Sequence, residues 1–453
     1  MEIVIDFSTV SENPMVFILW FFKTIDWIIP VVFLLVASVL GWQAHIRNKY
    51  RKERKYILLA IDVPKNNEQT PKAVENIFNH LAGAHQPLKF RHKWLLGEIP
   101  DSFSFEIVSI GGYIQFIVHL VEEYRDLIEA IIYAQYPDAE ITEIEDYTTA
   151  YRRMRFPNER FDLWGGEMKL AKSQYLPIRT YREFEDPAAE NVYKDSMAGL
   201  LEVLTRIGPG EQIWISIVVT PADNDWGEDS ANLIAKMTGQ KTAGGRDFFN
   251  VITDNLSYLV NSVISTPGET SASNSKNEPS RVPYMTKGEK DTVEAIEVKT
   301  GKIGFHVRSR LIYFGEKGKF RKPLANAIYG AFKQFNTLDL NSLKMDGRYL
   351  TGGIFFFKKR RVIARQNKIL RRYIYRGHYL EPGSYGQIMN SEELASIWHF
   401  PTLVVKAPLV KTTEAKRSQP PMSLPIEQTS LPPASAGSPP AAPRAEPPQN
   451  LPT

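Results

Sequence analysis

A chain of 453 residues with 43% hydrophobic and 23% charged residues has the composition of folded domains, and its length predicts two or three folded units. It contains no cysteine, which excludes disulfides, thiolate nucleophiles and zinc sites built on cysteine. The net charge of +4 is small, but positive residues are concentrated in two segments, at residues 47–55 and 358–376.

The first predicted element is a transmembrane helix over residues 25–46. Its central part, from Trp27 to Trp42, carries no charge, and about 20 apolar residues suffice for a helix to cross the hydrocarbon core. The basic juxtamembrane segment 47–55 follows, so the positive-inside bias places residues 1–24 outside and the remaining chain in the cytoplasm, at the inner (cytoplasmic) membrane. A cleaved signal peptide has the opposite order of charge, so we expect a retained, single-pass signal anchor.

Residues 56–150 show strand and helix patterns in the order β-α-β-β-α-β. Gly111 and Gly112 join the second and third strands as a two-residue hairpin turn. The strand patterns cover 56–63, 103–110, 113–120 and 140–147, and the helical patterns cover 71–81 and 122–134. This order is typical of a ferredoxin-like domain, in which two helices cover one face of an antiparallel sheet.

The same order recurs over residues 160–357, with an insertion at about 221–301. The strand patterns cover 167–172, 212–220, 302–314 and 353–357, and the helical patterns cover 189–207 and 323–335. The insertion has helical patterns near 230–237 and 286–298, separated by a polar linker at 266–280. The sequence therefore predicts an α+β protein with two tandem ferredoxin-like domains.

Residues 358–388 form a predicted basic linker whose first part contains no acidic residue. Its basic residues are Lys358, Lys359, Arg360, Arg361, Arg365, Lys368, Arg371, Arg372 and Arg376. Such a stripe binds the phosphates of nucleic acids or of anionic lipids. A solvated linker face or a protein-docking surface has the same composition, so these alternatives stay open here.

The C-terminal part of the chain contains a short helix and then a low-complexity tail. Residues 389–410 are predicted to hold a docking helix capped by Asn390 or Ser391. Residues 411–453 are rich in proline, alanine and serine and are expected to be disordered, because they lack the apolar side chains that form a core. The tail is either solubilising or a strand that docks into a proline-binding groove.

The sequence contains none of the motifs that mark common catalytic sites. It lacks the G-x-x-x-x-G-K-[ST] loop of nucleotide hydrolases and the G-x-S-x-G elbow of serine hydrolases. No two histidines have helical metal-ligand spacing near an acid, and the acidic residues at 140–146 are expected to protect a solvated sheet edge. We therefore expect no catalytic residue, no cofactor and no metal, and we expect that the protein is not an enzyme.

Three sequence blocks carry a resemblance to a known family. They are residues 104–147, residues 200–221 (LLEVLTRIGPGEQIWISIVVTP) and residues 389–401 (MNSEELASIWHFP). Together they resemble the region between the membrane segment and the motor in the membrane-anchored conjugative DNA-transfer ATPases of type IV secretion systems, particularly those of uncultivated small-genome bacteria. The resemblance covers about residues 47–425, and the family's ATP-binding residues have no counterpart in this sequence.

This resemblance implies a non-catalytic, membrane-anchored scaffold of a type IV secretion-like or conjugation-like apparatus, to which a separate motor ATPase docks. The expected docking residues are Glu392, Glu393, Leu394, Trp398, His399, Phe400 and Pro401. Relatives that assemble as rings also imply a homo-oligomer. The alternative function is a membrane-tethered nucleic-acid-binding module that uses the basic stretch 358–376.

Overall fold

The computed structural model describes residues 28–64, 67–84, 89, 91–184, 195–223, 226–238, 285–352, 356–376 and 386–402. The predictions for residues 1–24, for residues 411–453 and for most of the insertion therefore lie outside the described residues.

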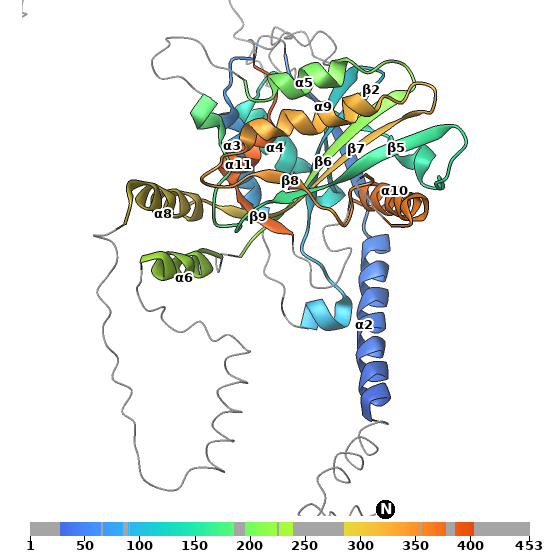
Figure 1. The fold of residues 1–453 in the computed structure, drawn as a ribbon, viewed down its shortest axis with the longest axis horizontal. Helices are drawn as coiled ribbons and strands as arrows, with labels where there is room; N and C mark the ends of the chain where they lie inside the picture. Colours follow the sequence, from blue (N-terminus) through green and yellow to red (C-terminus); the bar gives the residue numbers. More distant parts are fainter. Residues whose placement is uncertain are drawn as a thin grey trace, which may run out of the picture. The chain divides into compact units, whose positions relative to one another are not determined.

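The described strands form one antiparallel sheet. The strands are β1 (Tyr56–Asp62), β2 (Phe103–Ile110), β3 (Tyr113–Val121), β4 (Glu140–Ile144), β5 (Phe161–Leu170), β6 (Glu211–Pro221), β7 (Gly304–Glu316), β8 (Leu343–Met345) and β9 (Gln387–Asn390). Their order is β4-β1-β3-β2-β6-β7-β5-β8, and β9 pairs with the first residues of β7 (Figure 1). The predicted mixture of helices with an antiparallel sheet is confirmed.

The two halves of the chain are joined edge to edge in this sheet. The first half contributes β4-β1-β3-β2 and the second half contributes β6-β7-β5-β8. The join is the antiparallel pair β2–β6, in which Phe103 lies opposite Val219 and Ile110 lies opposite Gln212. The predicted hairpin turn between β2 and β3 is also confirmed, since Gly111 and Gly112 have φ values of 59° and 96°, which glycine adopts readily.

One face of the sheet is covered by five helices. They are α3 (Pro71–Leu81), α4 (Arg125–Gln135), α5 (Ala198–Thr205), α9 (Lys322–Phe332) and α11 (Ser391–Ile397). Side chains that alternate along the strands point to these helices and form the larger hydrophobic core; Phe105, Ile215 and Leu311 are examples from three strands. Short helical turns occur at Ala82–Ala84, His92–Leu96 (η3), Glu122–Tyr124, Thr149–Tyr151, Tyr181–Phe184 and Lys333–Phe335.

The opposite face is covered by α10 (Lys358–Ile374), and Figure 1 shows this helix on the other side of the strands from α5 and α9. The remaining strand side chains point here and form a second, smaller core with Ile369, Leu370 and Tyr373 of α10. Trp214 of β6 is fully buried in this core. The stretch predicted as a basic linker is therefore a packed helix for most of its length.

α2 (Ile28–Glu53) is, within the described part of the chain, the one helix that is long and apolar enough to cross a membrane. Its apolar side chains are exposed, for example Phe33 at 70% and Leu34 at 62%. A core helix would bury such side chains, so α2 is not part of the protein interior.

Two further helices lie at the two ends of the insertion. α6 (Trp226–Thr238) and α8 (Lys287–Thr300) pack against each other, which confirms both helical predictions there. α8 begins with a capping box, because the Thr286 side chain accepts from the Glu289 backbone while Glu289 accepts from the Thr286 backbone.

Two predicted elements besides the basic linker differ from the structure. The helix expected at 189–207 is shorter: residues 189–194 lie outside the described residues, and α5 begins only at Ala198, after a turn in which Asp195 accepts a hydrogen bond from the Met197 backbone at 2.7 Å. The strand expected at 353–357 is described only at residues 356–357, which form a turn. Residues 353–355 lie outside the described residues, and β8, at Leu343–Met345, pairs with β5 instead.

Candidate phosphate-binding surface

α10 is held on the sheet by buried ion pairs as well as by its apolar side chains. Arg372 donates from Nε to Oε1 of Glu167 on β5 at 2.8 Å, and Arg310 of β7 donates to the same oxygen at 3.0 Å. The guanidinium of Arg308 lies 3.5 Å from the other Glu167 oxygen. Burial by itself would raise the pKa of the Glu167 carboxyl, but Arg310 and Arg372 hold that pKa below its usual value.

A second ion pair fixes the C-terminal end of the helix. Arg376 donates to Glu106 of β2 at 2.6 Å and to Asp146 at 3.1 Å, and its side chain is buried. The Tyr147 hydroxyl donates to Glu106 at 2.7 Å and lies 2.9 Å from the Tyr373 hydroxyl. Asp146, which we expected at a solvated edge, is therefore part of this network. Burial favours a higher pKa for Asp146, but Arg376 depresses it well below its usual range.

The predicted basic residues divide into three groups in the structure. Arg372 and Arg376 are buried and paired with carboxylates of the sheet, so they are structural and not available to an external phosphate. Arg365 is half-buried and donates to the Leu350 carbonyl at 2.8 Å. The exposed members are Lys358, Lys359, Arg360, Arg361, Lys368 and Arg371, and we call their surface the α10 basic face.

The N-terminal part of the α10 basic face is electrostatically unfavourable for the helix itself, whereas Arg371, in the last turn, lies where the helix dipole favours a cation. Four consecutive cations, residues 358–361, occupy the first turn, where the helix dipole favours anions, and no acidic residue lies in that turn. Each pair of like charges three or four residues apart, such as Lys368 and Arg371, destabilises a helix by about 0.2–0.5 kcal/mol. An external anion would offset these costs, which is the physical reason to treat the face as a binding surface.

The C-terminal end of α10 lies close to the C-terminal end of α2. The Arg51 guanidinium is 5.9 Å from the centroid of the Tyr375 ring, directly after α10. Arg54 donates to Asp101 at 2.7 Å and so ties the last turn of α2 to the segment before β2. The last turn of α10, which holds Arg371, and the basic segment after the apolar part of α2 are thus neighbours, although about 300 residues separate them in the sequence.

The predicted docking residues lie in the protein interior. Glu392 is 6% exposed, and Glu393, Leu394, Trp398, His399 and Phe400 are each at most 1% exposed. The rings of Trp398 and Phe105 are 5.0 Å apart, and those of Trp398 and Phe116 are 5.7 Å apart. Pro401, which is half-buried, accepts from the Asn67 side chain at 3.1 Å.

The acidic and histidine side chains of this segment bind other parts of the same chain. Glu393 lies 2.9 Å from Lys299 of α8, and both side chains are fully buried. Burial lowers the pKa of Lys299, while Glu393 acts in the opposite direction. His399 lies 2.9 Å from Asp195, which also accepts from the Thr402 backbone at 3.0 Å.

The segment from Met389 to Pro401 therefore fixes α11 between α3, α8 and the sheet. The capping prediction is settled in favour of Asn390, which accepts from the Glu393 backbone at 2.8 Å. A partner could contact Trp398 or His399 only if this segment left the core, because the side chains have almost no exposed area. Docking of a motor ATPase through these residues therefore stays a prediction, and it requires this segment to leave the core.

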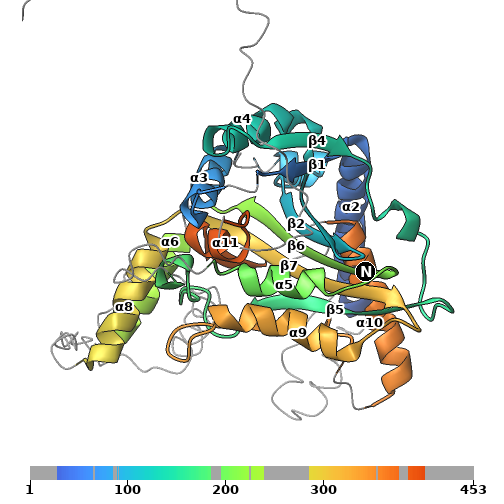
Figure 2. The same ribbon diagram turned by 90° about the horizontal axis from the view of Figure 1, so that it is seen from above.

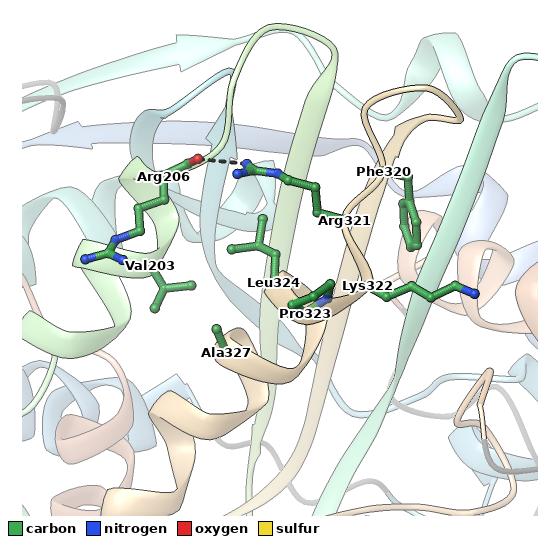
Figure 3. A pocket seen from close by; sticks show the side chains of 8 residues that line it. All are labelled: Val203, Arg206, Phe320, Arg321, Lys322, Pro323, Leu324 and Ala327. Atoms are coloured by element: carbon green, nitrogen blue, oxygen red, sulfur yellow. Dashed lines mark hydrogen bonds between the residues drawn. The ribbon is translucent and has the colours of Figure 1, made fainter.

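An open, mainly apolar pocket of about 630 Å³ lies between α5 and α9 (Figure 3). Its lining consists of Val203, Arg206, Phe320, Arg321, Lys322, Pro323, Leu324 and Ala327. Arg321 donates to the Arg206 carbonyl and to Glu211, each at 2.8 Å, so its guanidinium group is bound by other residues of this chain. Among these lining residues, the Lys322 amine is the one group that could act as an acid, a base or a nucleophile, and Figure 3 shows its side chain pointing away from Val203 and Ala327.

Comparison with known proteins gives a family assignment. The family described as "Domain of unknown function (DUF8128)" matches residues 43–413. No curated protein matches the sequence. The matched range begins in α2 and includes every described strand and helix after it.

Proposed function

The chain belongs to the DUF8128 family, and from this premise we propose that it is a non-catalytic, membrane-anchored scaffold of a type IV secretion-like or conjugation-like apparatus. α2 crosses the inner membrane once, with its N-terminal side outside and the sheet in the cytoplasm. The scaffold holds a motor ATPase of another chain at the membrane and assembles as a homo-oligomer.

The exposed apolar surface of α2 carries this proposal. Val32, Phe33, Leu34 and Leu35 are each more than half exposed, and an apolar surface of this length requires a nonpolar environment. The basic residues from Arg47 onward follow directly, which favours a cytoplasmic location for everything after α2. The resemblance of residues 104–147, 200–221 and 389–401 to conjugative ATPases supports the type of apparatus.

The fold supports a scaffold through the shared sheet. Each half of the sheet has the strand order expected of a ferredoxin-like unit, and we propose that the halves are two such units fused through β2 and β6. The buried carboxylates of Glu106, Glu167 and Glu393 are each engaged by a cation of the same chain. These acids therefore have structural partners, which favours a binding role over acid–base chemistry.

Affinity capture tests the scaffold proposal. The tagged full-length protein is extracted from its own membranes with detergent, and co-purifying chains are identified by mass spectrometry. We expect a P-loop ATPase together with other subunits of a secretion channel. A matched protein in which Phe33, Leu34 and Leu35 are replaced by Ser should lose the membrane fraction and these partners. Recovery of the intact protein without any ATPase would contradict the proposal.

A second function, nucleic-acid binding, is favoured by the α10 basic face. Its six exposed cations lie on one helix with no acidic residue, which suits contacts to a phosphate backbone. Replacing Arg361, Lys368 and Arg371 by Gln should weaken binding of duplex DNA and lower the slope of log K against log salt by about 2.7, at about 0.9 per phosphate contact.

Fluorescence anisotropy with labelled DNA at several salt concentrations measures this slope. The control replaces three exposed lysines elsewhere, Lys287, Lys290 and Lys317, by Gln, and should retain the slope. An equal effect of both triple variants would show that only net charge matters and would exclude a DNA site on α10.

A further inference from the structure

The turn η3, His92–Leu96, presents two apolar side chains to the outside. Leu95 is 60% exposed and Leu96 is 57% exposed, whereas the next residue, Gly97, is buried. Adjacent exposed leucines in a short turn contribute nothing to the core of this chain. Unlike a single exposed side chain, the two together form an apolar patch on η3, and such patches are candidate contact surfaces.

The shape of η3 is fixed by its own hydrogen bonds. The backbone of Glu98 donates to the His92 carbonyl at 3.1 Å, and His92 Nδ1 lies 2.9 Å from the Glu98 carboxylate. These bonds close the turn at its base. Leu95 and Leu96 are therefore held at the tip of a preformed loop.

η3 packs directly against α2, where the apolar part of that helix ends. Gly97 adopts φ +71°, and a Cβ atom there would lie 2.6 Å from the Ile46 carbonyl carbon and 2.8 Å from the Arg47 nitrogen. Only glycine permits this approach of the two backbones. Gln43 and Ile46 are buried, although Trp42 beside them is 57% exposed. Figure 1 shows the short sky-blue helix beside α2, on the side of the sheet from which α2 extends.

The contact with α2 places η3 at the depth of the membrane interface. The apolar stretch of α2 ends at Ala44, and Ile46 and Arg47 lie only about 3–5 Å farther along the axis at 1.5 Å per residue. The interfacial layer on each side of the hydrocarbon core is about 5–7 Å thick. Lys89 and Arg91, both exposed, precede the turn, so apolar side chains at the tip are flanked by cations, as in interfacial segments.

We propose that η3 is a second membrane contact, in which Leu95 and Leu96 insert into the cytoplasmic interface of the phospholipid bilayer while Lys89 and Arg91 face its anionic headgroups. This inference rests on the proposed membrane anchoring by α2. The contact fixes the rotation and tilt of the sheet relative to the membrane, because a single helix leaves the attached domain free to rotate about its axis. It also places the C-terminal end of α10, next to Arg51, at a defined height above the lipid.

The absence of cysteine makes a direct test available. Single-cysteine variants Leu95→Cys, Leu96→Cys, Leu34→Cys and Leu338→Cys of the full-length protein are labelled with an environment-sensitive nitrobenzoxadiazole dye. Each is reconstituted into vesicles of phosphatidylcholine and phosphatidylglycerol. Quenching by spin-labelled lipid is compared with quenching by iodide in the aqueous phase. Leu34 reports on α2, and Leu338, which is 95% exposed in the connection between α9 and β8, is the aqueous control of the same residue type.

We expect a blue-shifted emission at Leu95 and Leu96 with quenching by lipid and weak quenching by iodide, as at Leu34, and the reverse at Leu338. If Leu95 and Leu96 behave like Leu338 while Leu34 is quenched by lipid, the loop contact is refuted and the anchor stands. If Leu34 is also quenched by iodide alone, the membrane anchor itself is refuted, and the loop proposal falls with it.

Discussion

Replacement of Trp398 by Ala distinguishes a core residue from a docking residue. Trp398 is 1% exposed and is surrounded by aromatic rings. The ring centroids of Phe105, Phe400, Phe116 and Phe78 lie 5.0, 5.1, 5.7 and 6.5 Å from that of Trp398, all in tilted or edge-to-face arrangements. The substitution therefore removes a side chain at which β2, β3, α3 and α11 meet.

The expected cost follows from these contacts. Truncating a buried Trp to Ala costs about 3–5 kcal/mol, and favourable aromatic pairs add about 0.5–1.5 kcal/mol each beyond burial alone. We expect a loss of about 5 kcal/mol from the free energy of unfolding, which is a third or more of a typical total of about 5–15 kcal/mol. With a urea m-value of about 3 kcal/mol/M, the unfolding midpoint falls by about 1.7 M.

A conservative variant sharpens the test. The Trp398 indole nitrogen is buried and has no hydrogen-bond partner among the described residues. Trp398→Phe removes this donor, whose burial costs about 1–3 kcal/mol, while it keeps an aromatic ring among the four neighbours. The gain from removing the buried donor partly offsets the loss of ring volume. The free energy of unfolding of Trp398→Phe should therefore lie within about 1.5 kcal/mol of that of the original protein.

Urea unfolding of the full-length protein in detergent, followed by far-ultraviolet circular dichroism, measures these midpoints. Tyr113→Ala is the control, because Tyr113 is an aromatic residue that is 69% exposed, and it should change stability by at most about 0.5 kcal/mol. If Trp398→Ala unfolds like the control, Trp398 is not a core residue. The interpretation of residues 389–402 as interior would then be refuted, and the docking interpretation would be restored.

Three further predictions concern buried charge, pH and the α2 contact. Glu167→Gln leaves the buried guanidinium groups of Arg310 and Arg372 around a neutral amide, so the free energy of unfolding should fall by about 3–5 kcal/mol in the same urea assay. The control is Glu129→Gln, because Glu129 forms a partly exposed ion pair with Arg125; this variant should lower the free energy of unfolding by at most about 1 kcal/mol. Equal losses in Glu167→Gln and Glu129→Gln would contradict the ion-pair argument. Burial favours a higher pKa for Asp195, yet His399 and the backbone amides of Thr402 and Met197 hold it below its usual value. Its ionised form therefore stabilises the fold above the ordinary carboxyl pKa of about 3.9, and this stability is lost as the pH falls through the lower, folded value. The thermal midpoint should decline below about pH 4, and Asp195→Asn should flatten that decline; an unchanged pH profile would exclude Asp195 as the cause. Gly97→Ala introduces a Cβ atom 2.6 Å from the Ile46 carbonyl carbon at a positive φ, so η3 should separate from α2 and the dye at Leu95→Cys should become more accessible to iodide. Unchanged accessibility would show that the close backbone approach does not position η3.

The local elements of the first half could be predicted from the sequence because their signals depend on neighbouring residues. Alternating side chains in residues 103–110 and 113–120 and the Gly111–Gly112 turn predict a hairpin without knowledge of the rest of the chain. The α6 and α8 helices were predicted for the same reason, from helical periodicity. The apolar run of α2 is also a local property, and so is the charge that follows it.

The function of each charged residue was not predictable, since it depends on partners far away in the sequence. Arg372 and Arg376 have the same local sequence character as Arg371, yet they bind Glu167 and Glu106, which are 205 and 270 residues away. The helix dipole and capping pattern at residues 390–393 predict a helix start but not whether its acidic residues face solvent or Lys299. Burial decides that question, and burial is a property of the tertiary structure.

What the sequence by itself determined is the strands β1 to β7, most of the helices, the apolar helix at the N-terminal side and the basic character of residues 358–376, but not β8, β9 or the helical state of α10. Only the tertiary structure decided that β2 and β6 join the halves into one sheet, that α11 fills the core, and that η3 lies against α2. The physical reason is that periodicity reports which face of an element is apolar, whereas packing, register and ion pairing between distant segments decide which surface covers that face.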